Sequence, residues 1–286
     1  MPPRNPDSAP KFWGCVEELV KLRPDFLSIT YGAAGKDRTT ALNTIKRVVT
    51  DTPILPVAHL TCMDTPKEAV EQIVDEFLAE GVRMFLALRG DQQVDVESPR
   101  SKLVESAAEL TYLMRAQDKR RQRLNHRERF KTIARPLVIC VAAFPGGNPE
   151  LGTTPAQEID RLLQKQDAGA DFAITQLYYD PKVLDDFITL AHKRGVSIPI
   201  VAGIGPTFDH QRLLKIENNI NIKPSPELFY DLQNASTDTA REDIGLKFYT
   251  DLSTKALESG AVGLHFFTFN NLGPTVKLVE RLKECV

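Results

Sequence analysis

Seven short apolar runs, each ending in a cluster of small or polar residues, constrain the fold of this chain more than any other feature. The runs are Phe26–Thr30, Ile54–Ala58, Met84–Leu88, Leu137–Ala143, Phe172–Thr175, Ile198–Ala202 and Val262–Phe267. Helical patterns follow most of them, and apolar strands that alternate with amphipathic helices indicate a parallel sheet covered by helices. Such sheets bind ligands at the carboxyl ends of their strands. The polar clusters therefore predict a ligand site at one edge of the sheet.

The number of runs bears on the type of fold, because a closed (β/α)8 barrel of the TIM type has eight strands. The first helix, predicted over Ser8–Lys21, follows the start of the chain almost at once. We therefore expect an α/β barrel whose first strand would lie upstream of Met1. Helical patterns over Ser225–Ala235 and Thr237–Ser259 predict extra helices before the last strand. No Ser/Gly-rich linker divides the chain, which favours a single barrel domain over residues 1–286.

Composition and charge narrow the classes of partner. The formal charge of −2 gives no overall attraction to nucleic acid or anionic lipid, and no apolar run is long enough to span a membrane. No signal peptide is recognisable, and the four cysteines lack Cys-x-x-Cys spacing, which is typical of a reducing compartment. We expect a cytoplasmic protein that binds a small molecule and neither nucleic acid nor membrane; homo-oligomerisation stays open.

Three helix starts carry capping signals. Thr65 and Thr154 are each followed by Pro and then by Glu or Gln three residues on, and Asp180 precedes Pro181. A hydroxyl or carboxylate at the N-cap accepts a hydrogen bond from an unpaired backbone N–H, and Pro suits the first helical position. We therefore predict that Thr65, Thr154 and Asp180 cap three helices.

The segment Arg115–Arg135 is strongly basic, with nine Lys or Arg among twenty-one residues. It follows a helical pattern and precedes a strand, so we place it on the face opposite the strand carboxyl ends, away from substrate. The favoured interpretation is a solvated connection; a subunit or protein contact and an RNA or polyanion site are the alternatives.

The expected active edge lacks the common catalytic motifs. There is no G-x-S-x-G, P-loop, H-E-x-x-H or helix-opening G-x-G-x-x-G. His59 and Cys62 have no further ligand pair at matching spacing, so we expect no metal. The hydroxyls, amides and aromatic rings that remain suit a planar heteroaromatic ligand.

Five segments at this edge carry a family resemblance. They are Ser28–Ala33, Ala58–Cys62, Ala87–Asp91, Asp167–Gln176 and His265–Thr268. In order and spacing the chain resembles methylenetetrahydrofolate reductase from Pro2 to the C-terminus. The resemblance implies a flavin barrel of one-carbon metabolism and methionine biosynthesis. Such an enzyme reduces 5,10-methylenetetrahydrofolate to 5-methyltetrahydrofolate with NADH or NADPH, by ping-pong hydride transfer through FAD.

The resemblance also implies roles for individual residues. The implied FAD contacts are Thr30, Tyr31, Ala33, His59, Arg89, Gly90, Asp91, Ala107, Phe144, Asn148, Glu158 and Lys165. Arg89 and Lys165 would neutralise the pyrophosphate, and His59 would donate to phosphate or ring oxygens. The implied substrate contacts are Thr30, Gln176, Gln211 and Asn271, and the alignment near Gln211 leaves Arg212 as an alternative.

Asp91 and Gln176 carry the implied mechanism. A fixed negative charge at Asp91 beside the flavin ring would disfavour the anionic reduced form and so favour hydride donation. Gln176 corresponds to the amide that meets the pterin and the nicotinamide in turn. The family also has a general acid. It is a glutamate in a Glu-Phe-Phe-Pro-Pro motif, of which Pro2 and Pro3 match only the tail, so its position would precede Met1.

Four further positions depart from the family pattern. Phe144 and Phe267 stand where the family commonly has Tyr, Asn148 where it has His, and Asn271 where it has an Arg that helps to hold folate. Two alternatives therefore stay open: a non-catalytic or regulatory paralogue that binds flavin or folate, and a related barrel oxidoreductase with a different acceptor or cofactor. The sequence does not distinguish NADH from NADPH.

Overall fold

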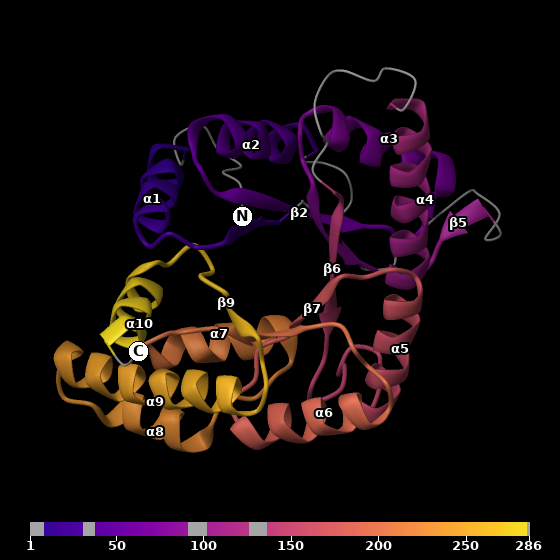
Figure 1. Ribbon diagram of the computed structural model, residues 1–286. Coiled ribbons are helices and arrows are strands. Elements are labelled where there is room, and N and C mark those ends of the chain that lie inside the picture. The colour runs from indigo at the N-terminus through magenta and orange to yellow at the C-terminus, as the bar shows by residue number, and fades with distance from the viewer. Residues whose placement is uncertain (1–8, 31–37, 91–101, 126–135, 285–286) are drawn as a thin grey trace. The chain divides into compact units, whose positions relative to one another are not determined.

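The structure is a computed structural model that describes residues 9–30, 38–90, 102–125 and 136–284 (Figure 1). The chain divides into two compact units. The first consists of residues 1–142 and 164–171, and the second of residues 143–163 and 172–286. The chain passes from one unit to the other after residues 142, 163 and 171, and the second of these positions lies within the helix α5 (Pro155–Asp167).

The first unit is built on four strands that pair in parallel in the order β1-β2-β4-β6. Their bounds are β1 Phe26–Ile29, β2 Leu55–Thr61, β4 Met84–Leu88 and β6 Val138–Ala143. The helices are α1 Ala9–Lys21, α2 Arg38–Asp51, α3 Lys67–Ala79 and α4 Ala107–Asn125. Apolar side chains of α3 form the predicted buried stripe, in which the Phe77 ring packs edge-on against Phe85 of β4 at 5.9 Å. Burial of this stripe is what fixes the helix on the sheet.

The second unit contains three parallel strands in the order β7-β8-β9. They are β7 Phe172–Thr175, β8 Ile200–Ile204 and β9 Gly263–Phe266. The helices are α6 Pro181–Lys193, α7 His210–Ile220, α8 Pro226–Asn234, α9 Asp238–Glu258 and α10 Gly273–Glu284. The helix α9 packs against α6, α8 and α10 (Figure 1). It buries Tyr249 and Leu252, so it supplies much of the apolar core of this unit.

The predicted α/β class is confirmed, because parallel strands alternate with helices through both units. The extra helices before the last strand are also confirmed, as α8 and α9. Two expectations about strand ends are wrong, since β8 continues past Ala202 to Ile204 and β2 continues past Ala58 to Thr61. The strand β2 continues through His59 because its pairing with β4 extends to Thr61 opposite Leu88, so His59 lies in a strand and not in the loop after it. No helix in the described part of the chain is long and apolar enough to cross a membrane.

Two of the three capping predictions are confirmed. The Thr154 hydroxyl accepts from Gln157 N at 3.3 Å while the Gln157 side chain accepts from Thr154 N at 2.9 Å, and Asp180 accepts from Lys182 N at 2.9 Å. The prediction for Thr65 is wrong. Thr65 and Pro66 form the short strand β3, which pairs antiparallel with β5 (Leu103–Val104), and Pro66 takes the N-cap position of α3 with no side-chain cap. Strand pairing has overridden the local capping signal.

Arg115 contradicts the expectation of a solvated basic segment. Its guanidinium donates to Gly169 O at 2.8 Å and to Leu137 O at 2.7 Å, and it forms an ion pair with the Asp171 carboxylate. Asp171 also accepts from Ile139 N at 2.6 Å. One side chain therefore holds α4, the start of β6 and the turn before β7 together.

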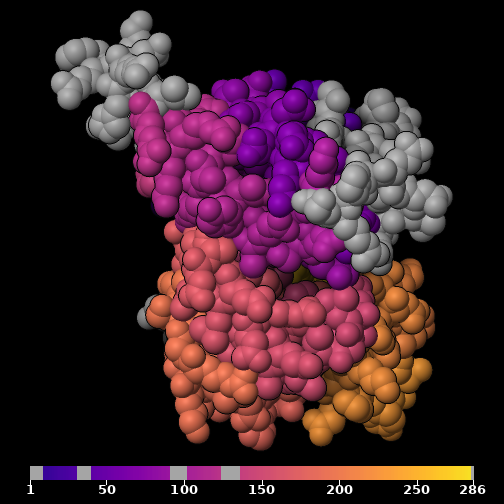
Figure 2. Space-filling view, turned by 90° about the vertical axis from the view of Figure 1, so that its right-hand side faces the viewer, coloured from indigo at the N-terminus to yellow at the C-terminus, as the bar shows by residue number. Residues whose placement is uncertain are grey.

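The rest of the described basic segment lies along α4, which is exposed at the surface of the first unit (Figure 2). Arg120 and Arg121 reach the acidic side chains of Glu71 and Asp75 on α3. These contacts agree with a solvated helix face that carries weak ion pairs. Residues 126–135 lie outside the described part of the chain.

Replacement of Arg115 should destabilise the first unit. We expect Arg115→Ala to lower the free energy of unfolding by about 2 kcal/mol or more, because two carbonyls and the Asp171 carboxylate lose a charged donor that is only partly exposed. Chemical denaturation with urea measures the change. Arg120→Ala is the matched control; its side chain is 65% exposed, so a change below about 0.5 kcal/mol is expected. Equal effects of the two substitutions would contradict a structural role for Arg115.

Candidate functional site

The carboxyl ends of β1, β2 and β4 bring three of the predicted cofactor residues to one edge of the first unit. Thr30 directly follows β1, His59 lies in β2, and Arg89 directly follows β4. Since Ile29 pairs with Ala58, Thr30 comes level with His59. Parallel pairing places these side chains at the same edge, as the sequence predicted.

The turn at Arg89 and Gly90 packs closely on the end of β2. Arg89 O accepts from Cys62 N at 3.2 Å and from Met63 N at 2.7 Å. Gly90 has φ +80, and a Cβ added there would come within 2.8 Å of the Thr61 Cβ. Only glycine tolerates this backbone and this approach. The turn therefore presents main chain, with the Arg89 side chain beside it, at the strand ends.

Cys62 lies beneath this turn as a buried thiol. Its Sγ is 3.4 Å from Leu88 O and 3.4 Å from Ser106 O, which brings the start of α4, with the buried Ala107, to the same edge. Burial raises the pKa of the Cys62 thiol to about 12. A protonated thiol is a poor nucleophile and a poor metal ligand. We therefore expect Cys62 to serve packing and not chemistry.

Lys165 adds a second cation at the carboxyl end of β6. The side chain extends from the last turns of α5, and its Nζ donates to Ala142 O at 2.7 Å although only 9% of the residue is exposed. Because β6 pairs with β4, Lys165 and Arg89 belong to the same sheet edge. Two cations and an imidazole at strand ends suit a phosphate-bearing ligand. Tyr31, Ala33 and Asp91 lie outside the described residues.

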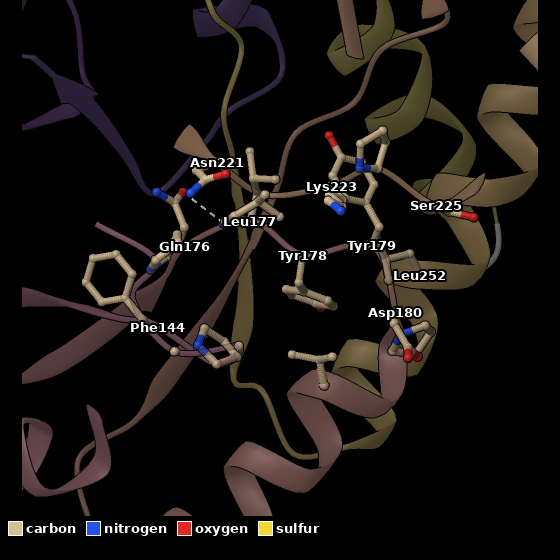
Figure 3. Close-up of a pocket in the computed structure, with 18 of the residues that line it drawn as sticks. Phe144, Gln176, Leu177, Tyr178, Tyr179, Asp180, Asn221, Lys223, Ser225 and Leu252 are labelled. Carbon is tan, nitrogen blue, oxygen red and sulfur yellow. Dashed lines mark hydrogen bonds between the residues drawn. The ribbon is translucent and has the colours of Figure 1, made fainter. Parts of the chain in front are cut away.

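A cavity of about 870 Å³ lies within the second unit (Figure 3). It is lined by the loops that follow β6 and β7, the segment before α8, and one face of α9. Three predicted site residues line it, namely Phe144, Asn148 and Gln176. Its volume is within the range of ligand pockets, and its aromatic and aliphatic lining suits a ligand with rings.

Two hydrogen bonds with main-chain groups fix Gln176 at the end of β7. Its N–H donates to Ala143 O at 2.7 Å, and its Oε1 accepts from Leu177 N at 3.0 Å (Figure 3). No described residue accepts a hydrogen bond from its Nε2. The carboxamide is thus oriented by Leu177 and keeps a donor for a ligand.

Asn148 and Glu158 maintain the shape of the loop after β6. Asn148 Oδ1 accepts from Glu150 N at 3.0 Å, and the Thr153 hydroxyl donates to Glu158 Oε1 at 2.6 Å. Gly147 has φ +84, and a Cβ there would come within 2.2 Å of Thr153 O. These contacts support the loop that carries Phe144, and contacts of Asn148 and Glu158 with a cofactor stay a prediction.

The remaining predicted substrate residues lie outside this cavity. Gln211 is exposed in the first turn of α7 beside His210, and the half-buried Asn271 closes a turn through its N–H to Thr268 O at 2.8 Å. The neighbouring Arg212 donates from Nη2 to Phe269 O at 2.8 Å. The structure therefore does not bring Gln211 and Asn271 to Gln176, and their contact with substrate stays a prediction.

Sequence reasoning missed Tyr178 and Lys223, which both line the cavity. The Tyr178 hydroxyl is buried without a hydrogen-bond partner among the described residues, and burial raises its pKa well above the ordinary value of tyrosine, so it stays a neutral donor. Its position two residues after Gln176 was the signal available in the sequence. Lys223 lies between α7 and α8, where nothing in the sequence pointed to a site.

The family profile and the similar proteins of known name agree on one family. The profile described as Methylenetetrahydrofolate reductase matches residues 1–283. The 5,10-methylenetetrahydrofolate reductase of Pectobacterium carotovorum subsp. carotovorum is 29% identical over 273 residues, covering 94% of this chain and 84% of that protein. Methylenetetrahydrofolate reductase (NADH) 1 of Arabidopsis thaliana is 28% identical over 280 residues, covering 94% of this chain and 45% of that protein.

One solved structure shares the fold across the whole chain. It is titled "Uncharacterized protein from Clostridium thermocellum binds two copies of 5-methyl-5,6,7,8-tetrahydrofolic acid". Its TM-score is 0.61 at 14% identity, and the alignment covers 100% of this chain and 93% of that protein. At this identity the likeness establishes the fold alone.

The buried thiols should be unreactive in the folded protein. At pH 8 we expect iodoacetamide to modify Cys62 and Cys140 at least about tenfold more slowly than the half-buried Cys15, because burial raises both pKa values and excludes the reagent. Peptide mass spectrometry after a short pulse measures each site. In guanidinium chloride the three should react alike. Rapid modification of Cys62 in the native protein would contradict its packing role.

Proposed function

Because the chain belongs to the methylenetetrahydrofolate reductase family, we propose that it reduces 5,10-methylenetetrahydrofolate to 5-methyltetrahydrofolate, with bound FAD and with NADH or NADPH as electron donor. The observation that carries this proposal is the family match along residues 1–283. Reductases of this name align with 94% of the chain, so the similarity is not confined to one motif. The reduced cysteines and small-molecule substrate further favour a cytoplasmic location.

The edge of the first unit suits the phosphate end of FAD. Arg89 and Lys165 supply positive charge at neighbouring strand ends, and Gly90 allows the turn that carries Arg89 to pack against Thr61 at the end of β2. When bound, FAD supplies a two-electron hydride carrier. The residues of the chain would hold its pyrophosphate through Arg89 and Lys165 and would hydrogen-bond it through Thr30 and His59.

The cavity of the second unit suits the folate ring system. A pterin edge carries alternating donors and acceptors, which a carboxamide can match, and Gln176 offers an oriented carboxamide at the cavity wall. The neutral hydroxyl of Tyr178 adds a donor, and the rings of Phe144 and Phe248 line the same space. These features support folate as the ligand of this cavity.

One shared amide would also explain a ping-pong order. If Gln176 binds the nicotinamide and the pterin in turn, as the resemblance implies, the two cannot occupy the site together. The oxidised donor must then leave before folate enters. Asp91, which lies outside the described residues, would contribute the fixed negative charge near the reacting ring.

A second candidate function is folate binding without reduction. The solved structure from Clostridium thermocellum is titled for binding 5-methyl-5,6,7,8-tetrahydrofolic acid and is not titled a reductase. The same fold can therefore bind the methylated folate outside a named reductase, and Asn271 in place of the family arginine is compatible with altered binding.

The visible absorbance of the FAD-reconstituted protein, recorded under anaerobic conditions, tests the proposal. We expect NADH or NADPH to bleach the flavin absorbance and methylenetetrahydrofolate to restore it. Folic acid, which lacks the one-carbon bridge, is the matched control and should leave the bleached spectrum unchanged. Bleaching without recovery would favour the folate-binding alternative, and failure to bind FAD would reject the flavin part of the proposal.

Replacement of Gln176 should weaken folate binding selectively. We expect Gln176→Ala to raise the Kd for 5-methyltetrahydrofolate about tenfold, because the loss of one ligand hydrogen bond in a buried site costs roughly 1.5 kcal/mol. FAD affinity should not change. Gln233→Ala is the matched control, since Gln233 is exposed on α8 and does not line the cavity, and it should leave the Kd unchanged; titration calorimetry measures both. An equal effect of the two substitutions would mean that folate binds elsewhere.

A further inference from the structure

The chain after β9 turns through two consecutive left-handed residues that are not glycine. Phe269 has φ +47 and Asn270 has φ +57. A left-handed backbone is unfavourable for a residue with a bulky side chain, and such strain is concentrated at functional sites. The Phe269 side chain gains little burial in exchange, since the residue is 42% exposed. Strain and exposure together indicate that this position serves something other than stability.

A hydrogen bond from α7 holds the strained segment. Arg212 donates from Nη2 to Phe269 O at 2.8 Å, and Asn271 N donates to Thr268 O at 2.8 Å to close the turn. Among the described residues the guanidinium hydrogen-bonds to main chain and not to a carboxylate, so its contact fixes a backbone position. Arg212 thereby acts on the orientation of the Phe269 ring.

The rings of Phe267 and Phe269 form an aromatic shelf over the end of β8. They stack with centroids 6.2 Å apart and an interplanar angle of 27°. A Cβ on Gly203 would come within 2.7 Å of the Phe267 ring, and one on Gly205 within 3.5 Å of the Phe269 ring. Because Gly203 and Gly205 have no side chains, both rings can lie against the backbone at the end of β8. The His265 ring packs edge-on against the Phe267 ring, with the centroids 4.7 Å apart. Burial lowers the pKa of His265 to about 4, so its imidazole is neutral.

The aromatic shelf lies near the end of the cavity that contains Gln176. Leu177 connects the two, because it lines the cavity and its Cδ2 would come within 3.1 Å of a Cβ on Gly205. The strand β8 separates β7 from β9, so the ends of β7 and β9 are roughly 10 Å apart at ordinary strand spacing. That separation suits a ligand with two linked aromatic systems, one at Gln176 and the other on the shelf.

We propose that Phe269 is a substrate-positioning residue whose ring stacks on the p-aminobenzoyl ring of folate, and that Arg212 keeps it in place. This proposal rests on the function proposed above, in which the pterin lies at Gln176. Offset stacking of aromatic rings is favourable beyond the area that it buries, and a ring that the backbone already holds loses little entropy on binding. Phe269 therefore determines affinity for folates that carry the benzoyl ring.

The experiment compares two ligands on the FAD-reconstituted full chain. The first is 5-methyltetrahydrofolate, and the second is 6-methyltetrahydropterin, which lacks the benzoyl ring. We expect Phe269→Ala to raise the Kd of the first about tenfold and to leave that of the second unchanged. Phe269→Tyr keeps an aromatic ring and should stay within about twofold of the parent for both ligands.

Two glycine substitutions separate binding from stability. Phe269→Gly relieves the strained backbone and removes the ring, so the melting temperature should stay equal or rise while the Kd for 5-methyltetrahydrofolate rises about tenfold. Asn270→Gly is the matched control, because it relieves the adjacent strain and keeps the ring; its affinity should not change. Arg212→Ala should weaken folate binding about threefold, again with no effect on the pterin.

Three results would overturn the proposal. They are an unchanged folate Kd in Phe269→Ala, an equal loss for both ligands, and a Phe269→Gly variant that loses stability together with affinity. If the parent protein binds both ligands and the Phe269→Ala variant keeps the parent's preference for folate over the pterin, the shelf alone is rejected. If the parent binds neither ligand, the proposed function fails and the shelf proposal fails with it.

Discussion

Parallel strand pairing is the constraint on which both candidate sites depend. In the first unit the register that sets Ile29 opposite Ala58 and Thr61 opposite Leu88 brings Thr30, His59 and Arg89 to one edge. In the second unit, the pairing of Gly203 with His265 sets the shelf rings beside the end of β8. A shift of one residue would turn each side chain to the other face of its sheet. Apolar burial, which fixes the register, therefore also positions the polar groups.

Main-chain carbonyls anchor the cations of this protein in several places. Lys165 donates to Ala142 O, Arg115 to Leu137 O and Gly169 O, and Arg212 to Phe269 O. A carbonyl neutralises no charge, so such a cation keeps its field while its side chain is held in one orientation. Lys165 is held in this way at the carboxyl end of β6. For Arg115 the Asp171 carboxylate removes this field, and the residue becomes structural.

Strands and helices were predictable because their signals are local and periodic, whereas the site depends on features without such signals. Thr65 and Thr154 have the same capping pattern, yet only Thr154 caps a helix, since Thr65 is drawn into a strand by Val104, 39 positions along the chain. Arg115 reads as one of many basic residues, and only the fold brings Asp171 to it. The left-handed backbone at Phe269 leaves no mark in the sequence, because glycine, the usual sign, is absent there.

The backbone strain in the segment after β9 favours a role in ligand binding. Each left-handed residue there costs on the order of 1–3 kcal/mol, and the exposed Phe269 ring recovers little of it by burial. The hydrogen bond from Arg212 to Phe269 O is solvent-exposed and offsets only part of this cost. Selection for stability alone would replace Phe269 or Asn270 by glycine. The retained ring is therefore better explained by what it contacts in a ligand complex than by what it adds to the folded chain.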